Sequence, residues 1–339
     1  MTDGVLVTGA TTPLGRRLCA ALLAERRGPV LAVGAEPASS ALGLPRDERL
    51  VYRRVDLARS RDVHDLLFGV ARELGVRTIV HRAVHRSAHD AGARVHRLNV
   101  ESTRELLVLA ERHPSITRVV FVSSADVYRV DADQPVLVGE DHPLQLEHHA
   151  TQRLRDRVEA DVTACMRMGM SRVGIVVLRL AELYAPECGS QLHDYLSSRV
   201  CFRPLGFDPM LGVLALDDAV HAIVLAIAST TQGIFNVPGR DVLPLSAAIR
   251  AAGRVAVPVP GPLLAPAYWL RARAGQGDFR YDLNRLQLHF SGVLDGRRAR
   301  EVLGYEPRTA VDFAGHASCS TSADDPTRWF LRALDRARP

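Results

Sequence analysis

Short apolar runs alternate with helical segments through the first half of the chain, and this alternation constrains the fold more than any other feature. The runs lie at residues 5–7, 30–33, 50–52, 78–80, 119–122 and 175–178. Each run fits a buried strand, and the segments between them are long enough for crossover helices. The pattern predicts an α/β fold built on a doubly wound parallel sheet with helices on both faces.

The regular alternation ends near Leu180, and prolines then divide the chain into short pieces. We therefore expect a larger sheet domain over 1–180, to which residues 211–240 return. A smaller α+β domain on the substrate side is expected over 181–210 and 241–313. Residues 314–339 read as a polar linker and a terminal helix.

Composition excludes several classes of protein. The 43 basic and 38 acidic residues are interleaved without a basic block, so no nucleic-acid partner is expected. No apolar run approaches about 18 residues and the first residues lack a leader pattern, so neither a membrane span nor secretion is expected. An odd number of scattered cysteines, without a CxxC pair, predicts a cytoplasmic protein with neither a disulfide framework nor a structural metal: Cys19, Cys165, Cys188, Cys201 and Cys319.

A glycine-containing loop follows the first predicted strand. Gly9 and Gly15 occupy the first and last glycine positions of a GxxGxxG pattern, and Thr12 replaces the middle glycine. Such a loop needs little side-chain bulk, because its backbone N–H groups and a helix N-terminus approach a pyrophosphate. Thr12 and Pro13 are expected to alter the turn, while the hydroxyl of Thr11 or Thr12 is a candidate phosphate ligand. The alternative is a tight strand-to-helix turn that binds nothing.

Further motifs follow this loop in a fixed order. They are Asp56-Leu57, His81-Arg82-Ala83, Asn99 with Thr103, the segment 122–128 that contains Ser124 and Tyr128, Arg179, Asp217-Asp218, 235–237 and 299–307. As an ordered series they resemble the extended (atypical) short-chain dehydrogenase/reductase family, in its NAD-dependent epimerase/dehydratase branch. The resemblance covers most of the chain and implies a Rossmann-type NAD(P)-binding domain.

The resemblance also implies a set of cofactor contacts. Gly9, Thr12 and Gly15 would line the pyrophosphate, and Asp56 with Leu57 would meet the adenine. Taken alone, Asp56 could equally cap a helix and Asn99 could tie neighbouring elements together. The candidate cofactor-binding residues are Gly9, Thr11, Thr12, Leu14, Gly15, Glu36, Asp56, Leu57, Ala83 and Asn99.

The choice between NAD and NADP depends on the end of the second strand. An acidic residue there binds the adenosine ribose hydroxyls and favours NAD, but this chain has Gly34 at that position. Glu36 lies two residues later and is a candidate substitute. Arg16 and Arg17 could instead meet a 2'-phosphate, or simply form a solvated helix face. The sequence favours NAD and leaves NADP open.

The chain contains no lysine, so all 43 basic residues counted as Lys and Arg are arginine. The resembled family uses a Ser or Thr, a Tyr, and a Lys four residues after the Tyr. Ser124 fits the first role. The segment 148–159 supplies neither Tyr nor Lys, and three registers remain for the pair: His149 with Arg153, Thr151 with Arg155, or Arg153 with Arg157.

Arginine retains the charge of the missing lysine but differs from it in bulk and in donor geometry. Among the three registers, only the first includes a side chain that titrates near neutral pH, His149. Tyr128 and Tyr184 are other candidate proton donors, although both also suit packing roles. The candidate catalytic residues are therefore Ser124, His149, Arg153 and Tyr128.

Histidines cluster at positions 81, 85, 89 and 96, but without carboxylates at ligand spacing they do not predict a metal site. We expect them on a solvated loop and helix. Helices over 99–111 and 152–168 are candidates for a homodimer contact; the alternative is that they only cover the sheet.

Three functions follow. The first is an NAD(P)-binding protein with a degenerate active site, without ordinary hydride transfer, that serves as a sensor, scaffold or regulator. The second is an active epimerase, dehydratase or reductase that uses Ser124 and an unusual acid on a nucleotide sugar or another small polar ligand. The third is an interaction module that binds no cofactor because Thr12 and Pro13 close the phosphate site.

Overall fold

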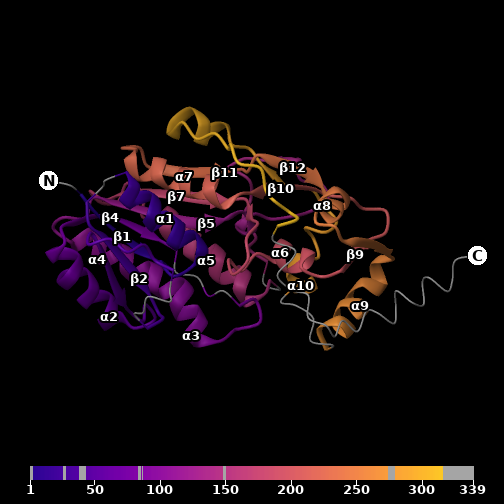
Figure 1. Ribbon diagram of the computed structural model, residues 1–339, viewed down its shortest axis with the longest axis horizontal. Helices are drawn as coiled ribbons and strands as arrows, with labels where there is room; N and C mark the ends of the chain where they lie inside the picture. Colours follow the sequence, from indigo (N-terminus) through magenta and orange to yellow (C-terminus); the bar gives the residue numbers. More distant parts are fainter. Residues whose placement is uncertain are drawn as a thin grey trace, which may run out of the picture.

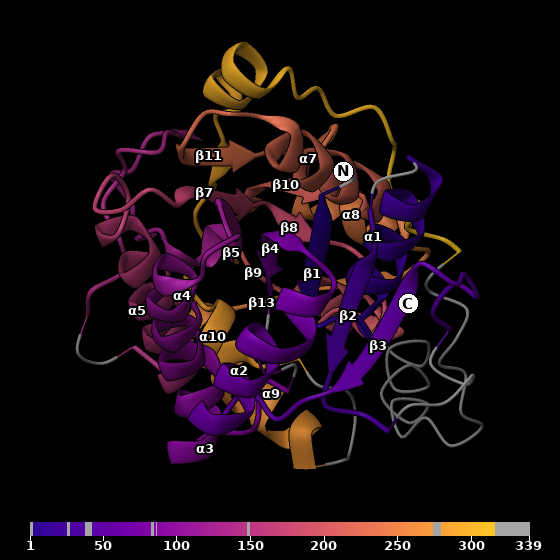
Figure 2. The same cartoon turned by 90° about the vertical axis from the view of Figure 1, so that its left-hand side faces the viewer.

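The central element is a seven-stranded parallel sheet. The computed structural model describes residues 3–25, 28–37, 43–82, 85, 87–147, 150–273 and 279–315. The strands are β1 (Gly4–Thr8), β2 (Val30–Gly34), β3 (Leu50–Arg54), β4 (Val76–His81), β5 (Arg118–Ser124), β7 (Gly174–Leu180) and β11 (Gly233–Val237). Their order is β11-β7-β5-β4-β1-β2-β3, with every neighbouring pair parallel (Figure 2). The predicted Rossmann-type fold is confirmed.

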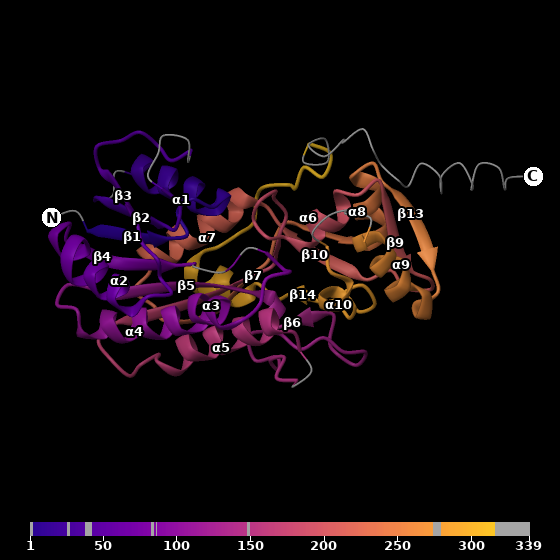
Figure 3. The same cartoon turned by 90° about the horizontal axis from the view of Figure 1, so that it is seen from below.

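Helices cover both faces of this sheet (Figure 3). On one face lie α1 (Pro13–Ala24) and α7 (Leu216–Ala228). The other face carries α2 (Ser60–Asp65), α4 (Ser102–Arg112) and α5 (Gln152–Met166). A short helix α3 (Ala93–His96) leads into α4 through a π-helical turn over Arg97–Glu101.

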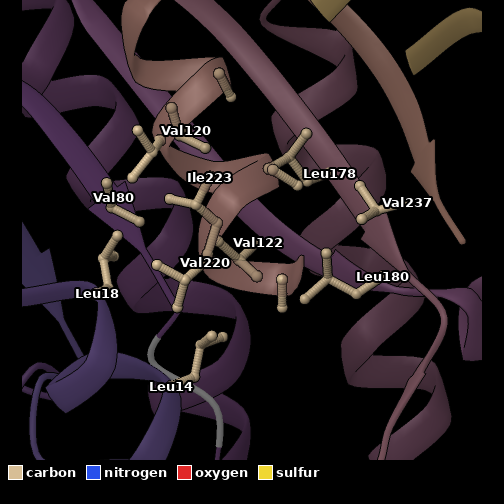
Figure 4. Packing of buried hydrophobic residues seen from close by; sticks show 14 of the residues in the cluster. Leu14, Leu18, Val80, Val120, Val122, Leu178, Leu180, Val220, Ile223 and Val237 are labelled. Carbon is tan, nitrogen blue, oxygen red and sulfur yellow. The ribbon is translucent and has the colours of Figure 1, made fainter. Parts of the chain in front are cut away.

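Branched apolar side chains fill the space between the sheet and the helices. Leu14 and Leu18 of α1 lie one turn apart and are almost fully buried, as expected for one face of a helix. They belong to the same core as Val220 and Ile223 of α7 and as the strand residue Val120 (Figure 4). A parallel sheet buried on both faces needs such continuous apolar strands, which is why the strands were readable from the sequence.

A smaller unit adjoins the carboxyl ends of the strands (Figure 1). It contains a three-stranded sheet of β8 (Glu182–Leu183), β10 (Met210–Leu214) and β12 (Asp241–Pro244). Two strand pairs join it, β9 (Val200–Pro204) with β13 (Val255–Val259) and β6 (Leu137–Val138) with β14 (Val293–Leu294). Its helices are α6 (Gln191–Leu196), α8 (Leu245–Ala251), α9 (Gly261–Arg273) and α10 (Tyr281–Asn284).

The segment 211–240 is shared between the two units. Its strand β11 forms an edge of the large sheet and its helix α7 packs beside α1, whereas β10 lies in the small sheet. Residues 316–339, where a terminal helix was expected, lie outside the described part of the chain. Among the helices that are described, none combines the length and the apolar character needed to cross a membrane.

Candidate functional site

The loop between β1 and α1 needs glycine at two of its three patterned positions. Gly9 has a φ of 65°, and a Cβ added to it would lie 2.5 Å from the carbonyl oxygen of Arg82. A Cβ on Gly15 would lie 2.3 Å from the carbonyl oxygen of Gly9. Thr12 is the helix N-cap, with an ordinary extended backbone (φ −71°, ψ 157°), and Pro13 opens the helix. The middle position therefore accommodates a side chain without strain.

The hydroxyls of this loop are used within the protein. Thr12 Oγ1 accepts a hydrogen bond from Gly15 N at 3.0 Å and donates one to the carbonyl of Gly9 at 2.8 Å. Thr11 Oγ1 donates to Glu36 Oε2 at 2.7 Å. Both hydroxyls are therefore already engaged in the structure, so the loop's backbone is the better candidate for contact with a phosphate.

A cavity of about 1450 Å³ opens in front of this loop, and we call it the strand-end cavity. It lies at the carboxyl ends of β1, β2 and β3, where ligands of doubly wound sheets bind. Six of the ten predicted cofactor residues line it: Gly9, Thr11, Thr12, Glu36, Asp56 and Leu57.

The carboxylate of Glu36 lies beside the end of β2, although Glu36 itself follows two residues after Gly34, where an acidic residue is expected. A Cβ on Gly34 would lie 3.0 Å from Glu36 Oε2 and 2.8 Å from Tyr52 Oη. The hydroxyl of Tyr52 donates to the carbonyl of Glu36 at 2.6 Å, which fixes this backbone. The glycine thus leaves the space into which the carboxylate of Glu36 folds back.

The other predicted cofactor residues have varied positions. Asp56 lines the cavity and accepts from Ala58 N at 3.1 Å, three residues before the N-cap of α2 at Arg59, so it is not the cap of that helix. Leu14 is buried in the core and makes no part of the cavity wall. Asn99 accepts from His85 N at 2.9 Å and donates to Asp156 at 3.2 Å, tying neighbouring segments together. Ala83 lies outside the described residues.

A second cavity of about 1040 Å³, which we call the polar cavity, adjoins the first. Thr12, Arg82 and His85 line both. Its wall carries many charged and hydroxyl side chains from β5, α5 and β8, namely Ser123, Ser124, Asp126, Arg153, Asp156, Arg157 and Glu182. It therefore lies where the resembled family would place its reacting groups.

Helix α5 presents two arginines to the polar cavity. Arg153 and Arg157 lie four residues apart, hence on one face of the helix. Arg155 is exposed and donates to the carbonyl of Ala150 at 2.8 Å. His149 is not among the described residues. Of the three registers, the pairing of Arg153 with Arg157 is the one whose two members both line the cavity within the described chain.

These two arginines are held by different partners. Arg157 forms an ion pair with Asp126, and burial lowers the pKa of its guanidinium to about 10. Arg153 donates from Nη2 to the carbonyl of Gly189 at 3.1 Å, and burial also lowers its pKa. Both remain protonated at neutral pH. An arginine pair in this state holds an anion well but does not exchange protons near neutrality.

Ser124 reaches the polar cavity at the end of β5. Its Oγ accepts a hydrogen bond from Asp126 N at 3.3 Å, a capping interaction for the short helical turn Ala125–Val127. Its neighbour Ser123 donates to Asp161 at 2.6 Å. Asp161 is fully buried and forms an ion pair with Arg179 at 2.6 Å, which joins α5 to β7.

The tyrosine candidates are occupied elsewhere. Tyr128 is buried, its hydroxyl donates to Asn236 Oδ1 at 2.6 Å, and burial raises its pKa to about 12. Tyr184 is buried as well, and burial raises its pKa to about 12. Neither lines the polar cavity. These arrangements favour packing roles for both tyrosines.

The histidine cluster does not lie wholly in solvent, so that expectation was wrong for its first member. His81 is 1% exposed and sits between Thr8 and Thr103, with each ring nitrogen 3.0 Å from a hydroxyl oxygen. His96 lies 2.8 Å from the buried carboxylate of Asp156. In the described ranges, no group of three or more histidine, cysteine or acidic side chains is arranged to hold a metal ion.

A third cavity of about 1010 Å³, the apolar cavity, continues from the polar cavity into the smaller unit. The two share Asp126, Ala181, Glu182 and Asn284. This cavity could not be predicted from the sequence, because its wall is assembled from short elements far apart in the chain. Asp126 and Glu182 were likewise missed as site residues, although each lies two residues after the end of a strand of the large sheet.

Comparisons with known proteins agree with this architecture. The family model described as the NAD dependent epimerase/dehydratase family matches residues 5–201. The uncharacterised protein Rv0501 of Mycobacterium tuberculosis is 31% identical over 313 residues, covering 90% of this chain and 80% of that protein. An uncharacterised protein of Mycobacterium bovis, Mb0513, matches to the same extent.

Solved structures share the fold along nearly the whole chain. MoeE5 in complex with UDP-glucuronic acid and NAD has a TM-score of 0.67 at 20% identity, covering 98% of this chain and 100% of that one. The Bordetella bronchiseptica enzyme WbmG in complex with NAD has a TM-score of 0.69 at 16% identity, covering 99% and 95%. The predicted resemblance is therefore confirmed: the chain belongs to the NAD-dependent epimerase/dehydratase family.

Proposed function

We propose that this protein binds NAD in the strand-end cavity and that its polar cavity holds a ligand without ordinary hydride transfer, so that it acts as a sensor or regulator. The observation that carries the proposal is the pair of arginines, Arg153 and Arg157, on the face of α5 that lines the polar cavity beside Ser124. In the resembled family a tyrosine and a lysine perform proton transfer from that helix.

The residues present fit a dinucleotide. The loop from Gly9 to Gly15 is tightly closed at a helix N-terminus, which favours contact between backbone N–H groups and a pyrophosphate. Glu36 and Asp56 supply carboxylates at the ends of β2 and β3, and Leu57 supplies an apolar surface. When bound, NAD would supply a hydride acceptor at the side of the polar cavity.

The arginine pair argues against a proton relay in that cavity. A group that first donates and then recovers a proton works best when its pKa lies near the operating pH. The pKa of Arg157, about 10, is well above neutrality, and its ion pair with Asp126 fixes the guanidinium. Arg153 and Arg157 are therefore suited to binding and orienting an anion.

The test is a calorimetric titration of cofactor-stripped protein with NAD, NADH, NADP and NADPH. We expect NAD and NADH to bind with one site per chain and at least tenfold more tightly than NADP, because Glu36 would repel a 2'-phosphate. Glu36→Gln should remove this preference while leaving NAD binding measurable. Failure of all four nucleotides to bind would refute the proposal and favour a module without cofactor.

The second half of the test concerns turnover. With NAD and either UDP-glucose or UDP-glucuronic acid, which are bound by structural neighbours, we expect no absorbance of NADH and no epimerised product. Arg155→Gln is a control variant, since Arg155 is exposed on the same helix. If the wild-type protein turned over either nucleotide sugar and Ser124→Ala abolished this activity, the proposal that the polar cavity is catalytically inactive would be overturned.

A second candidate function, an active epimerase, dehydratase or reductase, is favoured by one observation. His85 lines both the strand-end and polar cavities, and among the described residues no hydrogen-bond partner is found for its Nδ1. An imidazole can exchange protons near neutral pH, which neither arginine does. In that case Ser124 would orient the substrate, and His85→Gln would remove activity that the wild-type protein shows.

A further inference from the structure

We infer that the polar and apolar cavities together bind an amphipathic anion. Its small anionic head would lie at Arg153 and Arg157 in the polar cavity, and its apolar body would lie in the adjoining apolar cavity. The inference rests on the proposed function only in treating this cleft as a binding site. It differs from the nucleotide-sugar ligands of the structural neighbours, which carry a long polar and charged body.

The apolar cavity has the lining expected for a hydrocarbon body. Leu192 and Tyr195 come from α6, Leu211 from β10, and Leu288 and Phe290 from the segment after α10. Burying apolar surface against such walls stabilises a complex by about 25 cal/mol per Å².

The charges in this cavity disfavour a nucleoside diphosphate. Among the described residues that line it, Arg129 is the one cationic side chain, and it forms an ion pair with Asp131 at 2.7 Å. Two carboxylates, those of Asp126 and Glu182, stand where the apolar and polar cavities meet. Glu182 Oε1 accepts hydrogen bonds from Ser190 Oγ at 2.7 Å and Leu192 N at 3.1 Å. The described wall of the apolar cavity therefore offers no unpaired cation to a diphosphate.

The polar cavity has the complementary property. Arg153 and Arg157 place two planar guanidinium groups within one turn of helix, a geometry that suits a carboxylate or phosphate head. Burial lowers the pKa values of both arginines, and the nearby carboxylate of Glu182 partly offsets this by stabilising their charged forms. Ser124 would supply a further hydroxyl for the head.

The third acidic side chain in the wall of the polar cavity, Asp156, does not repel an anionic head group at the two arginines. Asp156 is buried and accepts from Asn99 Nδ2 at 3.2 Å, and it faces His96 at 2.8 Å. Its charge is therefore directed into the packing between α5 and the start of α4. The head and the body sites meet at Asp126, Ala181, Glu182 and Asn284, so one molecule can occupy both.

The test is a calorimetric titration with sodium decanoate, kept below its micellar concentration, together with octanoate, acetate, 1-decanol and UDP-glucuronic acid. We expect one decanoate per chain. Affinity should rise about fourfold per added methylene group, as for burial of hydrocarbon. Decanol, which lacks the charge, and acetate, which lacks the body, should each bind at least tenfold more weakly than decanoate.

Variants test which residues bind the anionic head and which bind the apolar body of the ligand. Arg153→Gln should weaken decanoate at least tenfold, while Arg155→Gln, on the exposed side of α5, should not. Leu211→Gln should weaken decanoate and flatten the dependence on chain length, whereas Leu263→Gln, exposed on α9, should leave it unchanged. Thermal melting of each variant verifies that it is folded.

Where decanoate binds, three results would overturn the inference: decanoate affinity that is independent of chain length, decanoate affinity that Arg153→Gln leaves unchanged, or tighter binding of UDP-glucuronic acid in competition with decanoate. The same preparations are titrated with NAD. Decanoate binding without NAD binding would refute the proposed cofactor while upholding the inference. NAD binding without decanoate binding would refute the inference alone.

Discussion

At the scale of single residues, the buried imidazole of His81 is held as a neutral group. Thr103 Oγ1 donates to the carbonyl of Asn99 and Thr8 Oγ1 accepts from Arg82 N. The remaining hydroxyl hydrogen of Thr8 is therefore free to point to Nδ1, and Nε2–H to Thr103, which assigns the tautomer from the network. Burial lowers the pKa of His81 to about 4.

This network predicts a pH dependence of stability. The unfolded chain takes up a proton at this histidine near pH 6.5 and the folded chain only near pH 4, so the unfolded state binds more protons between these values. The contribution of His81 to the free energy of unfolding should be fully present above pH 6.5, and it should fall by roughly 3 kcal/mol as the pH drops to 4. Urea unfolding between pH 7 and 4, for the wild type and His81→Gln, measures this. Equal slopes for both proteins would contradict the assignment.

Individual site residues were predictable to different degrees. Glu36 and Ser124 were identified because they lie within one or two residues of a strand end, where a doubly wound sheet places its ligands. The pairing of Arg157 with Asp126 was not, because it joins two segments whose distance depends on how α5 packs. Sequence spacing left three registers for the pair near the start of α5, and among the described residues Arg153 and Arg157 both line the polar cavity.

At the scale of elements, the start of α1 depends on one hydroxyl. Thr12 Oγ1 accepts from Gly15 N and donates to the carbonyl of Gly9, so it caps the helix and closes the loop. Thr12→Ala should lower the free energy of unfolding by about 1 kcal/mol, while Thr12→Ser should change it by much less. Denaturant unfolding measures both. A Thr12→Ala protein as stable as the wild type would show that the loop is held by its glycines alone.

Elements were predictable where one local pattern determined them. The inner strands of the large sheet are buried on both faces, and this produces continuous apolar runs that the sequence displays directly, whereas the edge strand β3 is half-buried and ends in exposed arginines. The short strands of the smaller unit, such as β8 and β14, have two residues each and carry no pattern of their own. Their pairing depends on contacts with distant segments, and so the walls of the apolar cavity could not be predicted.

At the scale of the whole molecule, association into a homodimer through α4 and α5 remains a prediction. Met166, at the end of α5, is 71% exposed, which leaves apolar surface available on that side. We expect light scattering to give twice the chain mass of 37.1 kDa, and Met166→Glu to shift the protein towards the monomer. Leu263→Glu, on the distant helix α9, is the control. A monomeric wild type at high concentration would rule out this contact.

The buried link between Asp161 and Arg179 has a consequence for how such a protein can evolve. Asp161 lies on the buried side of α5 and accepts hydrogen bonds from Ser123 of β5 and from Arg179 of β7. These contacts hold α5, β5 and β7 together next to the polar cavity. The residues that fix the helix are therefore distinct from Arg153 and Arg157, which line the polar cavity. Substitutions of the side chains that line the polar cavity can therefore be selected while the contacts that hold α5 in place are kept. This allows a new specificity to arise on an inherited scaffold.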